Sequence, residues 1–124
     1  MIRLGRREFE DLVGRCFADL PGFLQQYLDN LDVVVEDWPD AQTLEAVQTD
    51  HPGDLLGLYS GVSRVELGGD LPLIPDKITI FKGSIEAICR SREDVAQEVR
   101  KTLLHEVGHY LGMEEEELDR LGYS

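Results

Sequence analysis

Apolar residues near the start of the chain recur every three or four positions, which is the spacing of one face of an α-helix. This stripe predicts a helix from about Arg6 to Leu20, brought to an end by Pro21-Gly22. A second, shorter helical piece is expected through Leu24 and Leu28. The stripe of the first helix consists of Phe9, Leu12, Val13, Cys16, Phe17 and Leu20.

Four later segments have the β-branched or alternating composition of strands. The first, Leu31 to Asp37, is apolar at its centre and is expected near the middle of a sheet. Two short strands are expected at Leu55 to Tyr59 and Val62 to Leu67, and a fourth at Lys77 to Phe81. The glycine- and proline-rich residues 68–76 between them are expected to form a loop.

The last long helix begins with a capping pattern. The hydroxyl of Ser91 can accept hydrogen bonds from free backbone N–H groups, and Asp94 stands three residues later, as in a capping box. The helix is expected to run to about Leu111. Every fourth residue is apolar, which marks its buried face. That face consists of Val95, Val99, Leu103, Val107 and Leu111, with Leu104 beside it.

Three polar residues of this helix, in the motif HEVGH, lie away from the apolar face. At about 100° per residue, His105 and His109 fall about 160° to either side of Val107 and therefore next to each other, with Glu106 about 60° from His109. Imidazoles at positions i and i+4 can bind one metal ion, and in H-E-x-x-H the glutamate accepts a proton from water at a zinc ion. The alternative interpretation is a solvated polar face.

The residues after the motif extend this pattern. Gly112 follows His109 by three residues, and glycine tolerates the left-handed conformation that commonly ends a helix. Longer zincin motifs have a third ligand three residues after this glycine, which is Glu115 here. Glu114 and Glu116 are alternative ligands. The other acids of this run are expected in the first turn of a last short helix, where the helix dipole stabilises them.

Composition favours one globular domain that includes residues 1–124. The chain is 42% hydrophobic and 30% charged, so it can bury a core at a length typical of a single domain. Its net charge of -13, with no basic block, argues against nucleic acid and anionic membranes as partners. No apolar run reaches the roughly 20 residues needed to span a bilayer. With only two cysteines and no export signal, a cytoplasmic location is expected.

On these motifs the chain resembles the minimal zincin-like zinc metallopeptidase family of small bacterial proteins, formerly described as a domain of unknown function. The similarity runs through Leu55 to Val62, Leu71 to Ile88 and Val99 to Tyr123. The resemblance implies an α+β fold, a compact domain in which a small twisted mixed sheet packs against the N-terminal helix and the HExxH helix. It also implies zinc as the cofactor and peptide-bond hydrolysis of a peptide or protein substrate.

Carried over to this sequence, the family pattern makes His105 and His109 metal ligands, Glu106 the general base and Glu115 the third ligand. The family has aspartate at the position of Glu115. Glutamate is also a competent oxygen ligand, but its extra methylene changes its reach. Iron, manganese or nickel remain alternatives to zinc, because geometry and supply select among them more than sequence does.

Two functions follow from this pattern. The first is a zinc peptidase in which an extended substrate adds to the sheet at Lys77 to Phe81. The second is a catalytically silent zinc-binding or acidic protein-interaction module with the same ligands. Tyr59 and Tyr110 are candidates to stabilise a tetrahedral intermediate, with packing in the core as the alternative. His51, next to a proline, is expected on the surface.

Overall fold

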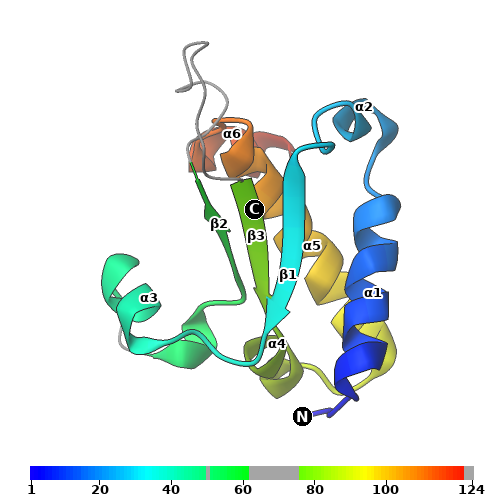
Figure 1. The fold of residues 1–124 in the computed structure, drawn as a ribbon, viewed down its shortest axis with the longest axis vertical. Coiled ribbons are helices and arrows are strands. Elements are labelled where there is room, and N and C mark those ends of the chain that lie inside the picture. Colours follow the sequence, from blue (N-terminus) through cyan, green and yellow to red (C-terminus); the bar gives the residue numbers. More distant parts are fainter. Residues whose placement is uncertain (50, 62–75, 122–124) are drawn as a thin grey trace.

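A three-stranded mixed sheet lies at the centre of the structure, a computed structural model that describes residues 1–49, 51–61 and 76–121 (Figure 1). The central strand is parallel to one neighbour and antiparallel to the other. Together with the helices packed against it, this sheet confirms the predicted small α+β domain. In spatial order the strands are β1 (Leu31–Glu36), β3 (Asp76–Phe81) and β2 (Gly57–Ser60).

Two long helices lie beside each other, and one of them packs directly on the sheet (Figure 1). They are α1 (Arg6–Ala18) and α5 (Arg92–Tyr110), and α5 contacts both β2 and β3. No helix in the described part of the chain is both long and apolar enough to cross a membrane. The shorter helical segments are α2 (Gly22–Gln25), α3 (Ala41–Ala46), the 3-10 helix η1 (Pro52–Asp54), α4 (Lys82–Ile88) and α6 (Glu115–Leu121).

The apolar faces predicted for the two long helices form much of the core. Phe9 of α1 is fully buried, as are Val99 and Leu103 of α5. Each such side chain contributes roughly 1.5–3 kcal/mol relative to an exposed position. Because α1 and α5 bury these faces against each other and the sheet, the polar flank of α5 is directed toward the edge of the sheet at β2.

The positions of two strands differ from the expectation. The segment 31–37 was expected at the middle of the sheet, but β1 borders only β3 among the described residues, and Val34 is 37% exposed. The segment 77–81 was expected at an edge, but β3 has a neighbour on each side. The β-branched centre of β1 reflects burial of one face, not a central position. Of the two edge strands among the described residues, β2 is the one that packs against α5.

Two further expectations concern the region between β2 and β3. The predicted strand at 62–67 lies outside the described residues, as do residues 68–75 of the predicted loop. Asp76, expected in that loop, is instead the first residue of β3.

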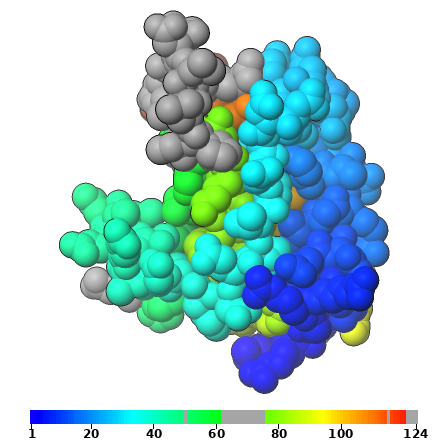
Figure 2. Space-filling view, in the orientation of Figure 1, coloured from blue at the N-terminus to red at the C-terminus, as the bar shows by residue number. Residues whose placement is uncertain are grey.

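The segment around α3 projects from the body of the molecule at one side of the sheet (Figure 2).

Candidate metal centre

The start of α5 follows the predicted capping pattern with one difference. The Ser91 hydroxyl accepts a hydrogen bond from the backbone N–H of Asp94 at 3.1 Å, as expected. The Asp94 carboxylate accepts from the N–H of Arg90 at 3.0 Å, one residue before the position used in a regular capping box. Both contacts satisfy backbone N–H groups near the helix start, so they help to fix the residue at which α5 begins.

The end of α5 is a glycine stop, as predicted. Gly112 has φ of 82°, in the left-handed region that favours glycine. Its N–H bonds to the carbonyl of His109 at 2.9 Å, and the N–H of Met113 bonds to the carbonyl of Gly108 at 2.9 Å. These two bonds form a Schellman motif. The chain therefore turns just after the end of α5 and leads into α6.

A second glycine brings α6 back onto α5. Gly108 is buried within α5, and a Cβ atom at this position would collide with the side chain of Leu118 in α6. Leu118 itself is fully buried. The absence of a side chain at position 108 therefore lets Leu118 pack directly on α5. The contact holds the segment that carries Glu115 beside the histidine-bearing turn.

His105, Glu106 and His109 are brought together on α5. The Nε2 atom of His105 lies 3.9 Å from Oε2 of Glu106, and Nδ1 of His109 lies 3.6 Å from Oε1. The two imidazole rings are edge to face, with centroids 4.5 Å apart. One ligand atom from each residue can be chosen so that all lie within 4.8 Å of one another. Among the described residues this is the group able to hold a metal ion.

Glu106 is buried rather than on a solvated face. Only 6% of the residue is exposed, and Oε1 accepts a hydrogen bond from the backbone N–H of Tyr59 at 2.7 Å. The register explains this contact. Phe81 bonds to the carbonyl of Leu56, so by the alternation of an antiparallel pair the N–H of Tyr59 points away from β3. The edge of β2 thus positions the glutamate.

The close approach of β2 to α5 depends on Gly57. A Cβ atom there would collide with Cγ2 of Thr102 and would come within 3.2 Å of the carbonyl oxygen of Thr79. Gly57 and Thr102 are both buried at this contact. Because Thr102 lies one turn before Glu106 on the same face of α5, this approach brings the N–H of Tyr59 within hydrogen-bond distance of Glu106.

Comparison with known proteins identifies the family. Residues 28–123 match the zincin-like metallopeptidase family, a range that includes the whole sheet and the HEVGH motif. The chain belongs to this family. Among solved structures it is similar to a conserved hypothetical protein of T. thermophilus, with 23% identity and a TM-score of 0.55 over 87% of this chain and 94% of that one. At this identity the likeness shows the fold alone. No curated protein matches the chain.

The donor set of this zincin-like domain fits a metal ion. Ligand atoms around a tetrahedral ion at about 2.1 Å lie roughly 3.4 Å from one another. His105 and His109 each have a donor nitrogen within 4.8 Å of the other's, so both imidazoles can approach one ion, with the Glu106 carboxylate beside it. Imidazole nitrogen and carboxylate oxygen are ligands that zinc accepts.

For Glu115, the third predicted ligand, the structure describes only the backbone. Glu115 is the first residue of α6, and its side chain lies outside the described part of the structure, so its role stays a prediction. Its neighbours Glu114 and Glu116 are exposed. Glu117 lies in the first turn of α6, as predicted. Its Oε1 atom accepts a hydrogen bond from the N–H of Glu114 at 3.4 Å.

The two tyrosines considered as transition-state stabilisers pack against each other. Tyr110 is 1% exposed, and its ring centroid lies 5.7 Å from that of Tyr59 in an edge-to-face arrangement. The Tyr59 hydroxyl bonds to Oδ1 of Asp76 at 2.7 Å. The group of Tyr59 that reaches the site is its backbone N–H. The sequence could not single out this group, because every residue except proline has a backbone N–H. His51 is exposed, as predicted.

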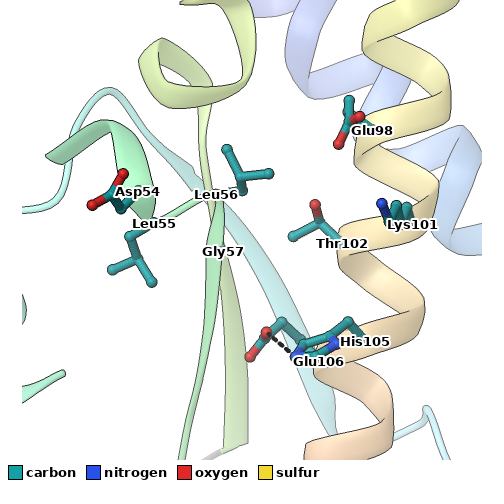
Figure 3. Close-up of a pocket in the computed structure, with 9 residues that line it drawn as sticks. All are labelled: Asp54, Leu55, Leu56, Gly57, Glu98, Lys101, Thr102, His105 and Glu106. Carbon is teal, nitrogen blue, oxygen red and sulfur yellow. Dashed lines mark ion pairs between the residues drawn. The ribbon is translucent and has the colours of Figure 1, made fainter. Parts of the chain in front are cut away.

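A pocket of about 290 Å³ adjoins the group on one side (Figure 3). One wall is the flank of α5, and the other is the segment from η1 into β2. His105 and Glu106 line one end, so a molecule in the pocket would lie next to the candidate metal position. The lining residues are Asp54, Leu55, Leu56, Gly57, Glu98, Lys101, Thr102, His105 and Glu106.

Proposed function

We propose that this protein is a zinc-dependent peptidase that hydrolyses peptide bonds. The observation that carries the proposal is the placement of Glu106. Its carboxylate is buried, held by the N–H of Tyr59 at 2.7 Å, and within 4 Å of nitrogen atoms of both histidines. A purely structural metal site would need the histidines but not a glutamate held in this orientation. Membership of the zincin-like metallopeptidase family supports the same chemistry.

His105, His109 and Glu115 would hold the zinc ion. When bound, zinc polarises a carbonyl oxygen and lowers the pKa of a water ligand to about 7. The packing of Leu118 on Gly108 supports Glu115 as the third ligand, since it keeps the start of α6 near the last turn of α5. A ligand from beyond the helix leaves the pocket between α5 and the segment from η1 into β2 for the substrate.

Glu106 would act as the general base. Its Oε1 atom is engaged by the N–H of Tyr59, so Oε2 is the atom that would take the proton from the attacking water. The protonated carboxyl would then deliver this proton to the leaving amine, as a base of this kind does in peptide hydrolysis. The hydrogen bond from Tyr59 keeps the carboxylate from rotating away during the transfer.

An extended substrate would add to the sheet at β2. This replaces the expectation that residues 77–81 form the receiving edge, because β3 is the central strand. Gly57 occupies the same kind of register position as Tyr59, so its backbone N–H and C=O also point away from β3. Strand addition at this edge would use the N–H and C=O of Gly57, since the N–H of Tyr59 is bonded to Glu106, and would bring a peptide carbonyl carbon next to Glu106.

The test combines metal content with hydrolysis. Elemental analysis of the purified protein should find one equivalent of zinc, and the His105→Ala/His109→Ala variant should contain none. The Glu106→Gln variant should keep zinc and lose cleavage of a peptide library measured by mass spectrometry. Glu93→Gln, an exposed change in the first turn of α5, is the matched control and should behave as the wild type.

Two results would decide against this proposal. Cleavage that survives Glu106→Gln at the wild-type rate would remove Glu106 from the mechanism. A protein that binds zinc but cleaves no peptide would instead favour the catalytically silent zinc-binding or interaction module.

A further inference from the structure

We infer that the pocket beside the metal centre is a specificity pocket that accepts a lysine or arginine side chain of the substrate. The inference rests on the proposed peptidase function and adds a substrate class to it. The position of the pocket, its apolar walls and its charges support this substrate class (Figure 3).

The pocket extends from the reaction site along α5. Glu98, Thr102 and His105 are spaced at i, i+4 and i+7, so they lie on one face of the helix. From His105 to Glu98 the helix rises by roughly 10 Å. A short side chain beside the bond that is cut would not reach Glu98 over this distance. A long, unbranched side chain with a polar end would.

The middle of the pocket is apolar. Leu55 and Leu56 line the wall opposite α5, and both are half-buried. Thr102, one turn from Glu98, lines the wall on α5 and is 8% exposed. These groups would contact the methylene stem of a lysine or arginine, which packs on apolar surface while its charged end reaches polar groups.

Away from Glu106, two further carboxylates line the pocket. Glu98 lies on the α5 wall at the end away from His105, and Asp54 lies beside Leu55 on the opposite wall (Figure 3). Lys101 is the one lysine or arginine among the lining residues. Among the described residues, neither Glu98 nor Lys101 forms an ion pair within 4.0 Å. Two carboxylates against one exposed ammonium group favour a cation in the pocket. The net charge of -13 acts in the same direction.

Lys101 distinguishes a cationic from an anionic occupant. It is exposed and has the same sign as the proposed occupant. If the pocket binds a cation, removing this charge should strengthen binding. If the pocket binds a carboxylate, Lys101 should be its anchor and the same change should weaken binding.

The experiment uses three capped pentapeptides that differ only at the central residue, which is lysine, norleucine or glutamate. Norleucine keeps all four carbons of the lysine side chain but lacks its ammonium group. Binding to the whole chain, with and without zinc, is followed by amide chemical shifts of Gly57, Glu98 and Thr102. We expect the lysine peptide to bind at least tenfold more tightly than either of the others. Glu98→Gln should reduce this preference at least threefold, Lys101→Met should increase it, and Glu93→Gln should leave it unchanged.

Equal binding of lysine and norleucine peptides, preference for glutamate, shifts outside the pocket or no binding at all would each overturn the inference. Hydrolysis is measured in the same samples, so the two proposals fail separately. Cleavage without a preference for lysine rejects the specificity pocket and keeps the peptidase. A preference for lysine that depends on Glu98, without cleavage, keeps the pocket and rejects the peptidase. Thermal unfolding of each variant shows that a lost preference does not come from a lost fold.

Discussion

The backbone N–H of Tyr59 donates a hydrogen bond of 2.7 Å to Oε1 of Glu106, and this bond joins the edge strand β2 to the histidine-bearing helix α5. Both partners are well shielded, since Glu106 is 6% exposed and Tyr59 is half-buried. A side chain proposed as the general base is therefore also a structural link between two elements. Substitutions on either side of this link should affect stability as well as activity.

The first prediction concerns Glu106 itself. Glu106→Ala should lower the free energy of unfolding of the metal-free protein by about 1–3 kcal/mol, because the shielded N–H of Tyr59 loses its acceptor. Glu106→Gln keeps an oxygen at nearly the same place and should cost clearly less. Urea denaturation followed by circular dichroism measures both, with Glu93→Ala at an exposed site as the control. Equal losses for alanine and glutamine would show that the hydrogen bond does not stabilise the fold.

The second prediction concerns the contact between α5 and α6. Alanine has a higher helix propensity than glycine by about 1 kcal/mol. Gly108→Ala should nevertheless destabilise the protein by roughly 1–3 kcal/mol, because the new Cβ collides with Leu118. Gly14→Ala in α1 is the matched control, since a Cβ there meets nothing within 4 Å and should stabilise by about 0.5–1 kcal/mol. The melting temperatures of the two variants should shift in opposite directions.

The third prediction concerns the approach of β2 to α5. Gly57→Ala should reduce both stability and hydrolysis, because the added methyl collides with Cγ2 of Thr102 and pushes Tyr59 away from Glu106. Thr102→Ser removes that methyl group and keeps the hydroxyl. The double variant should therefore recover part of the stability lost in Gly57→Ala, as measured in a double-mutant cycle. Losses that simply add would show that the two residues do not share this contact.

The fourth prediction is a pH dependence at the contact between α1 and α5. Arg92 donates hydrogen bonds to both carboxylate oxygens of Glu8, at 2.6 and 3.3 Å, and this hydrogen bonding holds the pKa of Glu8 below its ordinary value of 4.5. A lowered pKa in the folded state means that the stabilisation is complete above about pH 4.5 and is lost as the pH falls through the folded value. The gap in melting temperature between wild type and Arg92→Gln should therefore be largest near neutral pH and close in acid. A gap that stays constant from about pH 7 to about pH 3 would contradict this linkage.

Features that depend on residues close together in the chain were predictable from the sequence. Ser91 and Gly112 mark the two ends of α5 through backbone groups within a few residues of each, and the structure has the helix at Arg92–Tyr110. The spacing of His105 and His109 places them on one side of any α-helix, so their proximity needed no tertiary information. The apolar face of α5 was predictable for the same reason.

Only the tertiary structure decided which strand lies at the centre of the sheet, what covers Glu106 and what packs on Gly108. Strand order depends on pairing between segments distant in sequence, and the apolar residues of β1 and β3 show burial without showing a neighbour. The acceptor for the N–H of Tyr59 lies 47 residues away, and a backbone N–H has no signature in the sequence. A glycine in a helix indicates a close contact but not the side chain that makes it. Only the packing of α6 back onto α5 determines that this side chain is Leu118. The sequence alone thus determined the local geometry of the metal-binding motif, while long-range packing determined how its glutamate is held and which edge of the sheet faces it.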